Sequence, residues 1–213
     1  MAFLLIILMA VSTVLFMWQK NNIMSVATAL RYSKQELTEK INKNKRVAEI
    51  QVEEHGGSVI RDFSHEEEEE IRRGETTPEE ALKLLNEQND EIETDESLNS
   101  VSDLIKQSTE QLYLLKATYI GKLGSLERQA KSDYAAFLKE KKGATEKNKL
   151  IASYIKKVAA LESECDGAVS EILKKLELGL KEQGADTKIV KTMKKAYEDE
   201  KILKKSYFLS QYK

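Results

Sequence analysis

Residues 101–137 read VSDLIKQSTEQLYLLKATYIGKLGSLERQAKSDYAAF and carry the clearest pattern in the chain. Apolar side chains recur there in steps of three, four or seven residues, which predicts a long α-helix with an apolar seam toward a neighbouring helix. The same kind of spacing returns between residues 151 and 176, and Gly143 can end the first helix and Thr145 begin the second. The seam positions of the two predicted helices are Val101, Ile105, Leu112, Leu115, Tyr119, Leu126, Ala130 and Phe137, followed by Ile151, Tyr154, Val158, Leu161, Cys165, Ala168, Ile172 and Leu176.

A third helix is expected from about Thr187, with Gly184 as the stop of the preceding helix and Asp186 as the N-cap. Short loops between long helices make neighbours antiparallel, so residues 98–213 are predicted to form an antiparallel three-helix, coiled-coil-like bundle. A single proline and few glycines also favour an all-α fold. The predicted seam of the third helix comprises Ile189, Met193, Ala196, Tyr197, Leu203 and Tyr207.

The N-terminal end of the chain is apolar. Residues 2–18 contain no charged side chain, and their ten Leu, Ile, Val and Phe residues would favour membrane insertion by about 3–6 kcal/mol. We therefore expect a single transmembrane helix over residues 1–20, with an aromatic residue at the interface and Lys20 reaching the headgroups. The expected membrane-anchor residues are Phe3, Leu4, Leu5, Ile6, Ile7, Leu8, Val11, Val14, Leu15, Phe16 and Trp18.

The residues on either side of this apolar run indicate whether it is cleaved and how it is oriented in the membrane. No Lys or Arg precedes it, and the small-residue pattern Ala27–Thr28–Ala29 lies about ten residues beyond it, which favours an uncleaved signal-anchor over a cleaved signal peptide. Basic residues follow it, among them Arg31 and Lys34. The positive-inside rule therefore favours a cytoplasmic C-terminal side at the cell membrane (N-out, C-in), and an extracytoplasmic location stays open.

Net charge alternates along the chain, at +4 for residues 1–50, −13 for 51–100 and +7 for 101–213. Residues 21–57 are predicted to contain a basic juxtamembrane helix, which begins at a capping box formed by Ser33 and Glu36 and stops at His55-Gly56-Gly57. Residues 58–97 are predicted to be an acidic, partly flexible segment. Its short helices begin at Ser64 and at Thr77-Pro78, Gly74 ends the first of them, and an acidic linker runs from Asn86 to Ser97.

No motif in the sequence indicates catalysis, a cofactor or a metal. His55, Asp62 and His65 lack the close spacing of metal ligands, and the acids Glu66–Glu70 would point in different directions around a helix. The single cysteine, Cys165, lies on a predicted seam, where a thiol packs and does not react. We therefore expect a protein that is not an enzyme.

Lysines gather on the predicted third helix, where aromatic residues are interleaved. Binding to an acidic partner, or to the acidic segment of the chain itself, is one interpretation, and a solvated helix face is the other. The expected function is that of a membrane-anchored tether, scaffold or adaptor acting through a protein partner or self-association, with no nucleic acid or small-molecule substrate. An extracytoplasmic sensor or binding module is the alternative. The possible interaction face comprises Lys188, Lys191, Lys194, Lys195, Lys201, Lys204 and Lys205.

Overall fold

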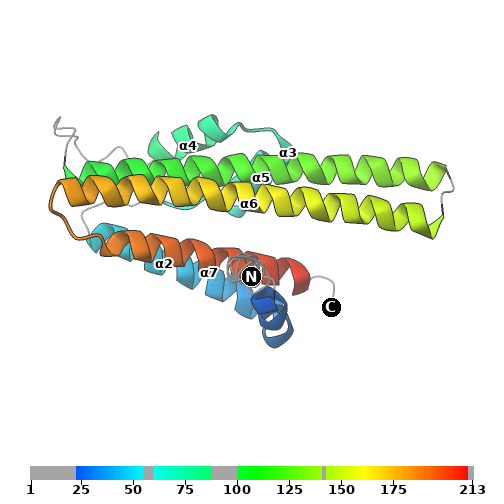
Figure 1. Cartoon of the computed structure of the whole chain (residues 1–213), viewed down its shortest axis with the longest axis horizontal. Coiled ribbons are helices and arrows are strands. Elements are labelled where there is room, and N and C mark those ends of the chain that lie inside the picture. Colours follow the sequence, from blue (N-terminus) through cyan, green and yellow to red (C-terminus); the bar gives the residue numbers. More distant parts are fainter. Residues whose placement is uncertain (1–22, 55–59, 88–99, 141–142, 211–213) are drawn as a thin grey trace, which may run out of the picture. The chain divides into compact units, whose positions relative to one another are not determined.

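The computed structural model describes residues 23–54, 60–87, 100–140 and 143–210 (Figure 1). In these ranges every regular element is an α-helix and there is no β-strand, which confirms the predicted all-α class. Residues 23–31 are helical and precede the other elements. The remaining helices are α2 (Lys34–Glu54), α3 (His65–Arg73), α4 (Pro78–Glu87), α5 (Val101–Lys139), α6 (Ala144–Glu182) and α7 (Lys188–Ser210).

The predicted transmembrane anchor, residues 1–20, lies outside the described ranges, as do residues 88–97 of the predicted linker. Inside the described ranges, no helix is long and apolar enough to cross a membrane.

The chain divides into two compact units. Unit 1 comprises Met1–Gln51 and Lys191–Lys213, and unit 2 comprises Val52–Val190. Unit 1 therefore joins the two ends of the sequence, and unit 2 holds the middle.

Unit 2 is built on the hairpin of α5 and α6, which run side by side (Figure 1). Each helix has 39 residues, a length of about 58 Å. Ser100 caps α5 in a capping box with Asp103, and Gly143 stands at the N-cap of α6. Lys122 of α5 pairs with Glu164 of α6 at 2.7 Å. The two predicted long antiparallel helices are therefore present.

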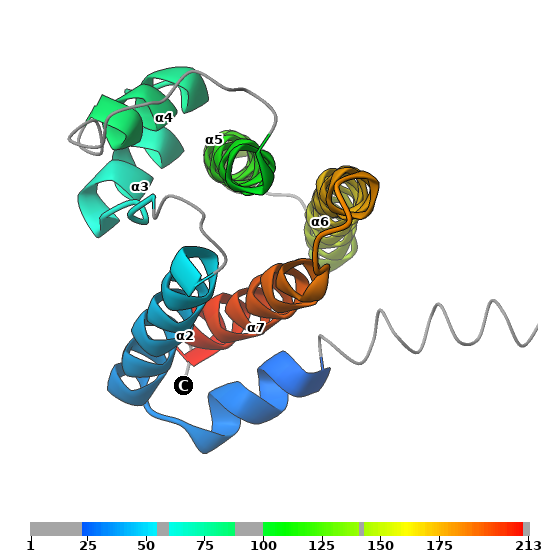
Figure 2. The same ribbon diagram turned by 90° about the vertical axis from the view of Figure 1, so that its left-hand side faces the viewer.

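The short helices α3 and α4 pack against α5 (Figure 2). Their starts are as predicted: Ser64 forms a capping box with Glu67, and the Thr77 hydroxyl accepts a bond from the Glu80 amide at 3.2 Å. The helix α3 ends at Gly74, whose φ of 78° lies in the left-handed region that glycine tolerates. Local sequence signals thus determine where these helices begin and where α3 ends.

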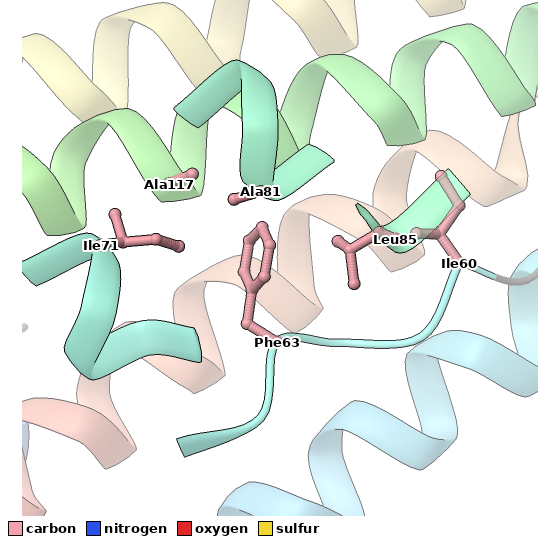
Figure 3. Packing of buried hydrophobic residues seen from close by; sticks show 6 residues of the cluster. All are labelled: Ile60, Phe63, Ile71, Ala81, Leu85 and Ala117. Atoms are coloured by element: carbon pink, nitrogen blue, oxygen red, sulfur yellow. The ribbon is translucent and has the colours of Figure 1, made fainter. Parts of the chain in front are cut away.

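A compact apolar cluster holds α3 and α4 on α5 (Figure 3). Its side chains come from the segment before α3, from α3 and α4, and from α5, and all are at most 4% exposed. Burying a large apolar side chain contributes roughly 1.5–3 kcal/mol. The helical part of the acidic segment is therefore a packed part of unit 2. The cluster consists of Ile60, Phe63, Ile71, Ala81, Leu85 and Ala117.

Gly124 lets the end of α3 approach the backbone of α5. A Cβ atom at this position would lie 1.9 Å from the Arg72 carbonyl oxygen, far inside van der Waals contact. At Gly121, one turn earlier, a Cβ atom would meet nothing closer than 3.8 Å. The crossing of α3 and α5 therefore requires glycine at residue 124 only.

In unit 1, α7 lies beside α2 and the helix over residues 23–31 (Figure 2). The Asn44 side-chain amide donates to the Ala196 carbonyl at 3.0 Å, and the buried Ser206 hydroxyl donates to the Ser25 carbonyl at 2.9 Å. The predicted bundle over residues 98–213 is divided between the two units, because α7 from Lys191 onward belongs to unit 1 with α2, whereas α5 and α6 belong to unit 2. An apolar seam shows that a helix has a partner, but it does not identify the partner.

Two further details differ from the predictions. Ile151 and Val158, which were assigned to the seam of α6, are 45% and 42% exposed. On α3, the spacing of four residues along the helix predicts pairs of Glu68 with Arg72 and of Glu69 with Arg73, whereas the structure shows other pairs. Arg72 instead pairs with Glu69 and with Glu127 of α5. Arg72 reaches an acidic residue on another helix. The spacing of residues along a single helix cannot predict such a partner.

Replacing Gly124 with Ala should destabilise unit 2, because the new methyl group would collide with the Arg72 carbonyl and push α3 away from α5. Overpacking of this kind costs about 1–3 kcal/mol. The change should appear as a lower free energy of unfolding in urea.

The matched control is Gly121→Ala, which adds a methyl group on the same helix at an ordinary van der Waals distance from Ile71. Alanine exceeds glycine in helix propensity by up to about 1 kcal/mol, so this variant should be at least as stable as the original protein. Equal destabilisation by the two changes would contradict the close approach at Gly124.

Candidate interaction surfaces

The net positive charge of the chain lies in unit 1. Its two segments, Met1–Gln51 and Lys191–Lys213, contain fourteen Lys and Arg against six Asp and Glu, a net charge of +8. Unit 2 contains twenty Lys and Arg against thirty Asp and Glu, a net charge of −10. The fold thus collects basic stretches from both ends of the sequence in one unit and leaves the acidic excess in the other.

The seven lysines of the possible interaction face spread over roughly 200° of the circumference of α7, at 100° per residue. Lys195 pairs with Asp199 at 2.6 Å, and Lys204 pairs with Glu200 at 3.2 Å. Asp199 raises the pKa of Lys195 by accepting its hydrogen bond. The structure therefore places acidic partners among these lysines. Of the seven, Lys188, Lys191, Lys194 and Lys195 are exposed, whereas Lys201, Lys204 and Lys205 are half-buried.

An exposed apolar surface lies on the helix over residues 23–31. The opposite side of this helix carries the buried Ser25 and Ala29, which face the interior of unit 1. An exposed apolar patch with basic residues beside it is typical of a surface that contacts a membrane or a protein. This surface was not predicted from the sequence, although its apolar residues recur there in steps of three and four. The exposed side chains are Ile23 (61%), Met24 (46%), Val26 (48%) and Leu30 (67%).

The acidic run Glu66–Glu70 on α3 does not form a cation site. Its members reach separate partners: Glu67 pairs with Arg61, Glu68 lies 3.5 Å from Lys116, and Glu69 pairs with Arg72. In the part of the chain that the structure describes, no group of three or more His, Cys, Asp or Glu residues is placed to hold a metal ion.

Lys116 of α5 is the centre of a largely buried charge cluster. Its side chain is 18% exposed and pairs with Asp62, which is 11% exposed, while Glu68 completes the cluster. The ammonium group also lies 6.0 Å from the ring centroids of Phe63 and Tyr113. Buried charges are costly unless they are paired, so this cluster fixes the position of the segment before α3 on α5.

The carboxyl group of Glu67 has a pKa far below its ordinary value. The Arg61 guanidinium donates two hydrogen bonds to it, at 2.6 and 2.8 Å, and these bonds lower its pKa to about 2. Burial acts in the opposite direction, and bonds from Ser64 lower the pKa further. Glu67 is therefore a structural group that links the helix cap of α3 to the preceding segment.

The far half of the α5–α6 hairpin is the second apolar surface. Between residues 131 and 160 most side chains of both helices are exposed, including several large apolar ones. An open depression of about 480 Å³ lies between the two helices beside Phe137 and Leu150. Cys165, nearer the middle of α6, is half-buried. The hairpin thus extends past the helices that cover α5 and presents an uncovered end.

Replacing Glu67 with Gln should weaken unit 2 at neutral pH and remove part of its acid sensitivity. A carboxyl group whose pKa is lower in the folded protein contributes stability above its unfolded pKa, near 4.3, and loses that contribution as the pH falls through about 2. The shift corresponds to at most about 3 kcal/mol, and partial exposure of the pair reduces this to about 1–3 kcal/mol.

The measurement is the difference in free energy of unfolding between neutral pH and pH near 2, for the original protein and the variant. That difference should be smaller in Glu67→Gln. The exposed neighbour Glu66 supplies the control, since Glu66→Gln should leave the difference nearly unchanged. An identical pH dependence in all three proteins would show that the Arg61–Glu67 pair does not stabilise the fold.

Comparisons of the chain with protein-family models, with curated proteins and with solved structures found no match. Function is therefore inferred from the chemistry and placement of the residues.

Proposed function

We propose that the chain is a single-pass membrane protein whose remaining helices act, without catalysis, as a tether, scaffold or adaptor. The observation that carries this proposal is the division of charge between the two units. Unit 1, with a net charge of +8, is the unit that contains the apolar run of residues 2–18 and the sequence that follows it. A basic unit next to a membrane-spanning segment suits the anionic surface of a cytoplasmic leaflet.

The magnitudes are consistent with this arrangement. Near an anionic membrane each Lys or Arg contributes about 1 kcal/mol, and the attraction falls off over a Debye length of about 8 Å at physiological salt. Exposed basic residues of unit 1 close to the membrane would therefore orient the unit after insertion, and the apolar run would supply the insertion energy itself. Lys191 and Lys194 are exposed and are suited to this role.

The exposed apolar side chains of residues 23–31 support the same orientation. They follow the apolar run within a few residues and include Ile23 and Leu30, which are 61% and 67% exposed. Apolar groups of this kind are stabilised at the boundary between headgroups and acyl chains. The acidic unit 2 would then carry the partner-binding surface, on a hairpin of two 39-residue helices.

The anchor is tested by two arginines in the apolar run. Each arginine at the centre of a spanning helix costs about 2.5–3.5 kcal/mol, so Leu8→Arg with Val11→Arg should cancel an insertion energy of about 3–6 kcal/mol. The original chain should stay in the membrane fraction through high-salt and alkaline carbonate washes, and the double variant should be released.

The control for this experiment is Leu8→Val with Val11→Leu, which keeps the apolar character and should be retained like the original. Release of the original chain by either wash would refute the membrane-spanning segment.

A reporter fused to the C-terminus distinguishes the two orientations. A cytoplasmic reporter signal supports the proposed tether, since basic residues follow the apolar run and none precedes it. A signal only from the other side of the membrane would instead support the extracytoplasmic sensor or binding module.

A further inference from the structure

One stripe of side chains on α6 has a basic end, an apolar middle and an acidic end. Its members follow one another in steps of four, four, three and four residues, which keeps them on one face of a helix. The three apolar members are 45%, 61% and 42% exposed, in chain order. From the N-terminal end, the stripe consists of Lys147, Ile151, Ile155, Val158 and Glu162.

The same face of α6 continues beyond this stripe and is buried there. Val169, Leu173, Leu176 and Leu180 follow in steps of three and four residues and are at most 4% exposed. The apolar face of α6 is thus covered along its C-terminal half and uncovered along its N-terminal half. A helix surface with this continuous pattern has the composition of a packing surface along its whole length.

The helix α5 adds apolar side chains to the same side of the hairpin. Tyr134 and Leu138 are 40% and 57% exposed and lie one turn apart. The Lys147 ammonium lies 5.9 Å from the ring centroid of Tyr134, which places this part of α5 beside the start of the α6 stripe. Exposed apolar side chains of the two helices therefore lie on one side of the hairpin, on a surface that we call the distal surface and define by Tyr134, Leu138, Ile151, Ile155 and Val158.

We propose that the distal surface binds the distal surface of a second copy of this chain, with the two α6 helices antiparallel. Each stripe has a basic end and an acidic end. Two copies of the stripe place opposite charges against each other only when they run antiparallel. A two-fold axis between Tyr154 and Ile155, at the middle of the apolar part, places Ile151 opposite Val158 of the other copy. It also places Lys147 opposite Glu162 of the other copy. Residues 147 and 162 lie equally far from the axis on its two sides, as residues 151 and 158 do.

The wider charge pattern of α6 favours the same arrangement. Residues 146–157 carry four lysines and one glutamate, whereas residues 162–171 carry four acidic and no basic side chains. Antiparallel copies set the basic stretch of one against the acidic stretch of the other, and parallel copies would set like charges together. Pairing of two hairpins gives a four-helix arrangement, in which each stripe faces apolar side chains. The inference rests on the proposed function only for the partner-binding role of the hairpin, and it does not require the anchor.

Cysteine cross-linking tests the pairing in membranes that contain the full-length chain. The background is Cys165→Ala, which removes the single thiol. Near the two-fold axis, Ile155→Cys should be joined efficiently by a short bis-maleimide. Lys147→Cys should be joined poorly, because antiparallel copies would hold the two thiols about 22 Å apart along the helix axis.

Equal cross-linking at both positions would overturn the antiparallel arrangement. Absence of dimers at both would overturn self-association, as would a product in which Ile155→Cys is joined to a different protein. A chain that stays in the membrane fraction but does not cross-link refutes this inference alone. Release from the membrane refutes the proposed anchor, and cross-linking of the released chain still decides the pairing.

Charge exchange gives an independent measurement by analytical ultracentrifugation in detergent. The single changes Lys147→Glu and Glu162→Lys should each weaken the dimer, because they set like charges opposite each other, and the double variant should restore it. Ile155→Glu should raise the dissociation constant by about 100-fold, since it places two carboxylates at the centre of an apolar contact. Failure of the double variant to recover, or an unchanged dimer in Ile155→Glu, would overturn the assigned contact.

Discussion

Unit 2 depends on the apolar cluster that α5 shares with the segment before α3 and with α3 and α4. Charged residues make up a third of the chain, so a helix such as α3, with five consecutive glutamates, has little apolar surface of its own. It is held because Ile71 and Phe63 are buried beside Ala117 of α5. The same attachment places the charge of Lys116 between Asp62 and Glu68. Apolar burial and charge pairing thus act at one site, and each would be weaker if the other were lost.

Local signals in the sequence were sufficient to predict where most helices begin and where α3 ends. Ser33, Ser64 and Thr77 bond to backbone amides within three residues, so their role is visible in a short window of sequence. The N-cap Ser100 was missed because the acidic partner of its capping box is an aspartate, Asp103, and not the more common glutamate. Starts and stops of helices are properties of a few neighbouring residues.

Contacts between distant segments could not be predicted in the same way. The partner of α7 follows from bonds such as that of Asn44 to Ala196, and these residues are far apart in the sequence. Gly124 resembles any other helical glycine until the carbonyl of Arg72 is placed against it. The ion pairs of Lys195 and Lys204 with acids on their own helix are different, because each spans four residues and this spacing is visible in the sequence. The uncovered face at Ile151 and Val158 could not be told from a buried seam by its spacing.

The buried bond from Ser206 to the Ser25 carbonyl has a mechanical consequence. It fastens the last helix of the chain to the first described one, and both serines are at most 1% exposed. A force that pulls or tilts residues 23–31 is therefore transmitted to α7 directly, without passing through the long middle of the sequence. Because α7 also carries the connection to α6, such a load would reach the hairpin from its C-terminal end. Residues 23–31 and α7 therefore belong to one packed unit, and a load on the first of these segments also acts on the second.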